Sequence, residues 1–288
     1  GNLNVPENIR VIIDTLFVKN AKKSLDKLNL RHRHYIKSEK YKGEIHFSTG
    51  SNTARSSSNF YALNNGIATL FEIRGVGIGK TSFKRRINSG LAVGFSFLKT
   101  AYENSNFIFN QIDIANTYTN DIVLQHERSI YTDVIKAIDI ESNELIDFST
   151  TMHSSKDSYA ISKRDRPLAY IIKKNNYGFI EKLNDVGVNY VELEKDTMIY
   201  SGGYKVVEFN NKFKVYEKMK MQKVVTSIEY SNNKFSKGDI LISMNQKRSN
   251  LIAELLEPEA PNSYVSFGII KTSLNNQLPI YRIKNFNN

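Results

Sequence analysis

The run IATLFEIR, residues 67–74, constrains the fold of this chain more than any other stretch. Five of its eight residues are apolar, and a turn containing Gly75, Gly77 and Gly79 follows directly. This pattern is typical of a strand buried on both faces of an α/β sheet. From 81 to about 102, apolar residues then recur every three or four positions, which predicts a helix. The sequence therefore predicts a strand–turn–helix unit. The apolar positions of the helix are Phe83, Ile87, Leu91, Phe95, Leu98 and Tyr102.

The rest of the chain divides into two parts with different patterns of predicted secondary structure. Residues 9–28 predict a helix that starts after Pro6, the alternation at 30–38 predicts a strand, and the polar stretch 48–59 predicts a long loop. Later β-prone runs, including 263–270, are interrupted by helical patterns at 176–188 and 248–258. We therefore expect an α/β domain over 1–115 and a β-rich domain over 116–288.

Composition excludes several classes of protein. With 40% hydrophobic and 24% charged residues, the chain is expected to be globular rather than disordered. No apolar run reaches the roughly 18 residues of a membrane span. Cysteine is absent, which excludes disulfides, a thiolate nucleophile and Cys-ligated zinc. The chain starts at Gly1 without methionine, so the lack of a visible secretory signal says nothing about its compartment.

The net charge of +11 raises the question of an anionic partner. The densest basic cluster, 214–223, alternates with apolar residues, which favours a solvated strand face over a nucleic-acid surface. Aromatic residues nevertheless alternate with lysines in the β-rich half of the chain. A non-catalytic binding module for a polyanion, a glycan or a protein partner therefore stays an alternative. The aromatic residues are Tyr200, Tyr204, Phe213 and Tyr216.

The glycine-rich turn does not match the common nucleotide-binding patterns. A Walker A loop needs a glycine five residues before the Gly of Gly-Lys-Thr, and that position is Arg74. In the dinucleotide pattern the third glycine would fall on Lys80. The glycines are therefore expected to permit a tight turn. A nucleotide hydrolase with Lys80 as a phosphate ligand is a minor alternative.

Glu72 is an acid inside an apolar run, and burying a carboxylate is unfavourable unless it is paired or functional. In a strand, Glu72 and Arg74 would point to the same face, which allows an ion pair. The alternative is a catalytic carboxylate that projects into a cleft from the carboxyl end of a sheet strand, where α/β sites collect.

FEIRGVGIGKTSFKRRI resembles the segment around the catalytic glutamate of zinc metallocarboxypeptidases. It is most similar to a bacterial branch that has a β-rich C-terminal module. The resemblance extends upstream through TARSSSNFYALNNGIATLFE and downstream to GDILISMNQKRSNLIAELLEPEAPNSYVSFG. These pieces occur in the same order along most of 25–283.

The resemblance implies a fold, an activity and residue roles. The fold would be part of a carboxypeptidase-like mixed sheet with helices, followed by a mostly β domain. The activity would be zinc-dependent hydrolysis of peptides or proteins at the C-terminus, with zinc polarising the scissile carbonyl. Glu72 would be the general base and acid. Arg55 would contact the substrate, and the alternative is an ordinary exposed loop cation. Arg74 would contact substrate or support the site. The resemblance favours a periplasmic or secreted location and leaves side-chain specificity open.

The family's zinc ligands, His-x-x-Glu and a later His that precede the glutamate, are missing from this sequence. We therefore expect the chain to be the C-terminal portion of such an enzyme, or a degenerate relative. Zinc would be bound in the full-length enzyme and not by this chain, and an N-terminal fragment of the same protein would be a partner. His32 and His34 could begin a zinc site on one strand face, but no third ligand is evident. His126 and His153, in the β-rich part, are expected at the surface or in turns.

Overall fold

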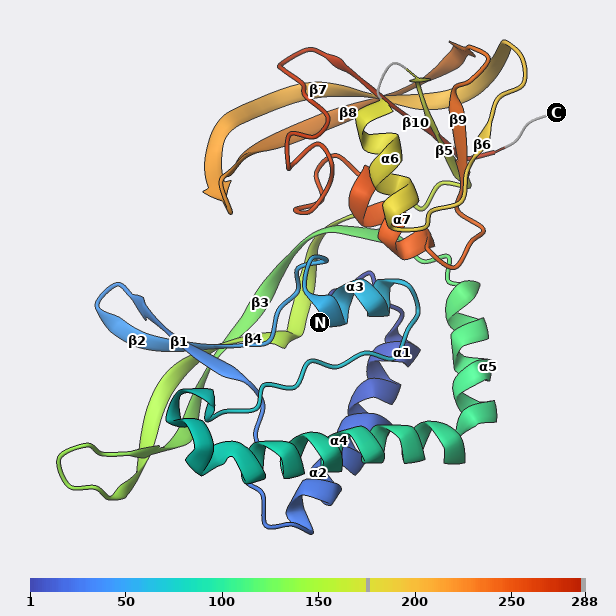
Figure 1. Ribbon diagram of the computed structural model, residues 1–288. Helices are drawn as coiled ribbons and strands as arrows, with labels where there is room; N and C mark the ends of the chain where they lie inside the picture. Colours follow the sequence, from blue (N-terminus) through green and yellow to red (C-terminus); the bar gives the residue numbers. More distant parts are fainter. Residues whose placement is uncertain (175–176, 286–288) are drawn as a thin grey trace.

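The structure is a computed structural model that describes residues 1–174 and 177–285, without the side chains of Tyr177 and Phe213. Asn176, in the predicted helix at 176–188, and the side chain of Phe213 therefore lie outside the described residues. The molecule has mixed α/β content with two sheets, and a β-rich part follows the helical part (Figure 1). The predicted fold class is confirmed. Within the described residues, no helix is long and apolar enough to cross a membrane.

The chain begins with one helical stretch in three sections, as predicted for 9–28. Pro6 is the N-cap residue of this stretch and makes no side-chain capping hydrogen bond, whereas Glu7 supplies an acidic group in the first turn. Its inner face carries Ile9, Ile12 and Phe17, all buried. The sections are α1 (Glu7–Ile12), the π-helical η1 (Ile13–Val18) and α2 (Lys19–Asp26).

A four-stranded sheet follows, in the order β1-β2-β4-β3. The strands are β1 (Ile36–Tyr41), β2 (Glu44–Thr49), β3 (Ile122–Ile138) and β4 (Leu145–Arg164). β2 and β4 are parallel, and the other pairs are antiparallel. The strand predicted at 30–38 forms only from Ile36, so the prediction was wrong for 30–35. Since β3 and β4 pair with β1 and β2, this sheet extends past the predicted boundary at 115.

Three helices and a glycine-rich turn lie between the two halves of this sheet in the sequence. The predicted loop 48–59 ends earlier than expected, because α3 starts at Ser57. The helix predicted from 81 to about 102 is confirmed as α4, with η2 as a 3₁₀ turn before it. The elements are α3 (Ser57–Leu63), η2 (Val76–Ser82), α4 (Phe83–Glu103) and α5 (Ser105–Asn116).

The β-rich part is an antiparallel sheet in the order β6-β9-β5-β10-β7-β8, covered by two helices (Figure 1). It contains the largest apolar cluster of the molecule. The helix predicted at 248–258 is confirmed, whereas the expected strand at 263–270 consists of turns and bends. The elements are β5 (Ala169–Ile172), α6 (Tyr177–Asp185), β6 (Val191–Glu192), β7 (Thr197–Tyr216), β8 (Met219–Phe235), β9 (Ile240–Ser243), α7 (Ser249–Leu256) and β10 (Gln277–Ile283).

A buried carboxylate on α7 joins the two parts of the chain. Glu254 is 3% exposed, and its Oε1 accepts hydrogen bonds from the Nδ2 atoms of Asn2 at 2.7 Å and Asn4 at 2.8 Å. Asn4 also donates to the backbone of Val123 on β3. Burial raises the pKa of Glu254 although these amides favour its charged form. The N-terminal segment is therefore held to α7 by a charge that burial disfavours.

We predict that Glu254 makes stability fall as pH rises. Its folded pKa is raised above its ordinary value, so its contribution is fully present below pH 4.5 and is lost as pH rises through the folded pKa. Glu254→Gln removes this titration but keeps an acceptor oxygen for both asparagines. The unfolding free energy of the variant relative to the wild type, measured by urea denaturation, should therefore increase from pH 4 to 7. A difference that stays constant over this range would contradict the prediction.

Candidate catalytic site

The run 67–74, which carries Glu72, does not form the predicted buried strand. It is irregular, and Leu70, Phe71 and Glu72 are exposed. Among the described residues, no backbone–backbone hydrogen bond involves 67–74. A strand needs a neighbouring strand to pair its peptide groups, and neither sheet provides one here. The prediction of a buried strand ending in a cleft was therefore wrong for this chain by itself.

Glu72 also lacks the ion pair that was the alternative. Within the part of the chain that the structure describes, Glu72 makes no ion pair, with Arg74 or with any other residue. A hollow of about 380 Å³ lies between α3 and the start of α7, but Glu72 is not among its lining residues. The Glu72 carboxylate therefore faces solvent.

The turn after Glu72 is built around two glycines with positive φ, at 109° for Gly75 and 57° for Gly79. The Ser82 hydroxyl donates to the carbonyl oxygens of both glycines. A side chain at Gly75 would collide with Ser82 and Arg85. The glycines thus permit a tight turn, as predicted. This turn places Lys80 at the surface.

Arg74 lies beside α4 rather than in a pocket. Its carbonyl oxygen accepts a hydrogen bond from Arg85 Nη2 at 3.0 Å, and its residue is exposed. Phe71 contacts Phe97 edge-on, with ring centroids 5.5 Å apart. The segment 71–74 therefore runs along α4 in the opposite direction, as Figure 1 also shows.

Arg55 binds the β-rich part of the chain. Its guanidinium lies 3.8 Å from the ring centroid of Tyr216 and 4.9 Å from that of Phe267. Its Nε donates to Asn262 Oδ1 at 3.2 Å, and Nη1 lies 3.7 Å from Glu217 Oε2. Arg55 thus fixes the loop before α3 against the β-rich part. It is more than the ordinary loop cation that was the alternative to a substrate contact.

The structure does not bring the three predicted site residues together. Arg55 contacts Tyr216 and Phe267, Arg74 follows α4, and no described contact joins either arginine to Glu72. The roles of these residues in catalysis and substrate binding stay predictions.

The residues of this chain do not fit a zinc site. Among the described residues, no group of three or more His, Asp or Glu side chains could hold a metal ion. His32 and His34 do not share a strand face, because 30–35 is not a strand. His32 Nε2 lies 2.8 Å from Asp26 Oδ1, whereas His34 lies beside Lys22.

Sequence reasoning missed a pair of histidines in the four-stranded sheet. His46 Nδ1 on β2 lies 2.9 Å from His153 Nε2 on β4, and the rings are stacked with centroids 5.2 Å apart. These two residues are 107 positions apart in the sequence. Only the parallel pairing of β2 with β4 brings them together, so no local signal could have identified the pair.

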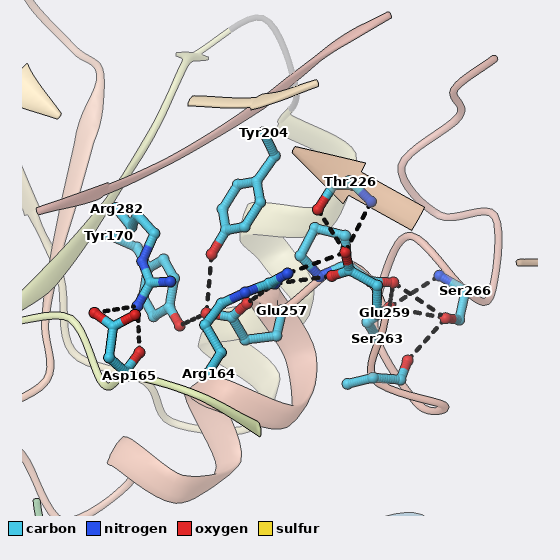
Figure 2. A network of polar contacts seen from close by, with 12 residues as sticks. Arg164, Asp165, Tyr170, Tyr204, Thr226, Glu257, Glu259, Ser263, Ser266 and Arg282 are labelled. Carbon is cyan, nitrogen blue, oxygen red and sulfur yellow. Dashed lines mark hydrogen bonds and ion pairs between the residues drawn. The ribbon is translucent and has the colours of Figure 1, made fainter. Parts of the chain in front are cut away.

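The clearest buried polar network is centred on Glu257, in the motif Leu-Leu-Glu-Pro that follows α7 (Figure 2). Glu257 is fully buried and lies 2.5 Å from Arg164 Nη1, at the end of β4. Its Oε1 also accepts hydrogen bonds from the hydroxyls of Tyr170 on β5 and Tyr204 on β7. Arg164 binds Glu259 as well, at 2.8 and 3.1 Å. The motif that carried the resemblance therefore joins β4, β5 and β7 to α7.

The charges in this network stabilise one another. Burial alone would lower the pKa of Arg164, but Glu259 and Glu257 raise it above its ordinary value. Burial, followed by the charge of Glu257, raises the pKa of both Tyr170 and Tyr204 well above the usual range. The two hydroxyls therefore stay protonated and donate to Glu257.

Comparisons with known proteins support a carboxypeptidase relationship. The chain is 29% identical to Carboxypeptidase 2 of Trichophyton equinum over 293 residues, which cover 98% of this chain and 54% of that protein. Carboxypeptidase 2 of Trichophyton rubrum gives the same identity and coverage. Probable carboxypeptidase 2 of Arthroderma benhamiae is 28% identical over 89% of this chain and 50% of that protein.

The chain spans about half the length of these curated relatives. The relatives are fungal, so they do not confirm the predicted bacterial branch, and their match does not confirm that this chain is a C-terminal portion. No protein-family model matches the chain, and no solved structure matches it.

The contacts of Arg55 predict a structural effect that is separate from any substrate role. Arg55→Ala removes the stacking on Tyr216 and Phe267 and should lower the free energy of unfolding by about 1 kcal/mol. Arg33→Ala, at an exposed arginine in 30–35, is the matched control and should change it by less than about 0.5 kcal/mol. If the two substitutions changed the free energy of unfolding in urea equally, the predicted stabilising effect of the Arg55 contacts would be disproved.

Removing the central carboxylate of the buried network should be strongly destabilising. Glu257→Gln keeps the volume but leaves Arg164 with Glu259 as its remaining charged partner, and we expect a loss of about 3 kcal/mol. Glu229→Gln, at an exposed position on β8, should cost less than about 0.5 kcal/mol. Chemical denaturation of both variants would test this, and a loss below 1 kcal/mol for Glu257→Gln would refute it.

Proposed function

We propose that this chain is part of a zinc-dependent carboxypeptidase that hydrolyses peptides or proteins and releases their C-terminal residues. The observation that carries this proposal is the similarity to proteins named Carboxypeptidase 2 across 98% of the chain. Because the chain spans about half of those proteins, the activity is proposed for a longer protein. The resemblance of FEIRGVGIGKTSFKRRI to the segment around a catalytic glutamate is independent support.

In this proposal Glu72 is the general base and acid. As a carboxylate it takes a proton from the attacking water and returns it to the nitrogen of the leaving residue when the peptide bond breaks. The exposure of Glu72 and its lack of an ion pair among the described residues leave the carboxylate available for this role. A base must lie within about 2.6–3.2 Å of the group it deprotonates, so the site also has to fix the position of 67–74.

Arg55 and Arg74 are the proposed contacts to substrate or site. An arginine can bind a peptide's terminal carboxylate with two parallel hydrogen bonds. Arg74 has an exposed side chain two residues after Glu72, which supports a role beside the reacting groups. Arg55 already contacts two aromatic rings, so it would bind substrate only with the donors that its own contacts leave over.

Zinc chemistry cannot be derived from this chain, because its described residues do not fit a metal site. The proposal therefore assigns the zinc ligands to an N-terminal fragment of the same protein. It follows that the chain by itself is inactive.

The alternative of a non-catalytic binding module is not favoured by the relatives, which are named as carboxypeptidases. One of its aromatic residues is also unsuitable. Tyr204 is fully buried and donates to Glu257, so it cannot contact a ligand at the surface.

The proposal predicts the outcome of one substitution in the longer native gene product. Glu72→Gln should lower kcat for release of C-terminal residues by about 10²–10⁴-fold, because the general base is lost. The stability of the protein and its zinc content, measured by metal analysis, should not change. Glu181→Gln, at an exposed position of α6, is the control and should keep full activity.

Undiminished activity of Glu72→Gln would contradict the proposed role of Glu72. Stoichiometric zinc and C-terminal residue release by the 288-residue chain without any further polypeptide would contradict the proposed place of the zinc ligands, because it would put them within this chain.

A further inference from the structure

Most of the large apolar side chains of α4 face solvent rather than the core, whereas Phe97 packs against Phe17. The solvent-facing residues form one stripe along the helix, which we call the α4 stripe, and they are the positions that the sequence predicts to be buried. Such a stripe on a 21-residue helix is unfavourable in water unless something covers it. Its members are Phe83 (57% exposed), Ile87 (44%), Leu91 (52%), Phe95 (66%), Leu98 (68%) and Tyr102 (86%).

The buried side of α4 is the opposite one and is poorer in large apolar groups. At about 100° per residue, the buried Val93, Ser96 and Thr100 lie across the helix from the α4 stripe. Val93 packs with Ala21 and Leu25 of α2. Hence α4 already packs against α2 on its less apolar side. The α4 stripe, on the other side, has no such packing partner among the described residues.

The neighbouring run 67–74 lacks a strand to pair with. Its backbone groups have no backbone partner among the described residues, although its sequence is that of a buried strand. It lies against α4, since Phe71 contacts Phe97 and Ile73 approaches Gly90. Leu70 and Val76 add exposed apolar surface beside it. The unpaired backbone of 67–74 therefore lies next to the exposed apolar face of α4.

Together these groups expose apolar surface on a scale that monomers rarely leave uncovered. Half-exposed to fully exposed aromatic and aliphatic side chains present about 100 Å² each, so the α4 stripe alone amounts to roughly 600 Å². The curated relatives are about twice as long as the stretch that matches this chain. A polypeptide of the required size thus exists in the related proteins.

We propose that the α4 stripe and the run 67–74 dock the remaining segment of the longer protein, which supplies the other strands of an α/β sheet. In this assembly 67–74 pairs with a strand of that segment, and the α4 stripe covers the sheet. Pairing fixes Glu72 at a strand end beside residues that only the docked segment carries. The inference rests on the proposed function for its view of which polypeptide docks, but its test does not depend on activity.

The test uses this chain and the remaining part of the longer native gene product, expressed separately and mixed. Light scattering after size exclusion should show a 1:1 complex. Hydrogen exchange should slow in 67–74, where backbone amides become paired, and over α4. Leu98→Asp should weaken binding at least about 30-fold, as expected for a buried apolar contact at an interface.

Leu145→Asp is the matched control, because Leu145 on β4 is 67% exposed, against 68% for Leu98, and lies outside the α4 stripe. It should leave the affinity unchanged. Both variants should unfold at the same denaturant concentration as the unaltered chain, since neither leucine is buried.

Several outcomes would overturn the docking proposal. They are a native product without such a segment, a complex that Leu98→Asp does not weaken, or self-association of this chain that Leu98→Asp abolishes, which would make a second copy the occupant. The proposed function is tested separately. A complex without peptidase activity would refute the function and leave the docking intact, whereas full activity of this chain alone would refute the docking and leave hydrolysis intact.

Discussion

Peptide groups have to be hydrogen-bonded, and this requirement decides where the chain forms strands. The β-rich part meets it internally, because β5 pairs with β9 on one side and with β10 on the other. All four residues of β5 are buried. The run 67–74 has a similar apolar sequence but no neighbour among the described residues, and it stays irregular. The difference between the two segments therefore lies in their partners rather than in their residues.

The two parts of the molecule are joined by polar side chains as much as by apolar packing. Glu254 and Glu257 are buried carboxylates at and just after α7. The first binds asparagines of the N-terminal segment, and the second binds Arg164 and two tyrosines. Buried charges are tolerated only where hydrogen bonds and counter-charges are supplied, so these contacts restrict how the parts can be arranged. Arg55 adds a third link at the surface.

Much of the fold could be predicted, but less of the candidate site. The periodicity of α4 was sufficient to locate that helix, and Pro258 correctly ended the helix at 248–258. Glu72 was identified by its place in a motif, yet the cleft expected around it is not formed by this chain. The pairing of His46 with His153 and the convergence on Glu257 had no local signal, because their partners are distant in the sequence.

By itself, the sequence determined the helices near 9–28, 81–102 and 248–258, most strands, the tight turn at Gly75 and Gly79 and the relationship to carboxypeptidases, since these depend on periodicity, backbone freedom and residue order. The helices α3 and α5 were not predicted. Only the tertiary structure decided which face of α4 is buried. An amphipathic helix carries its pattern wherever it lies, but burial requires a surface to pack against. In this chain α2 provides that surface on the less apolar side, so Leu98 and Phe95 remain in water.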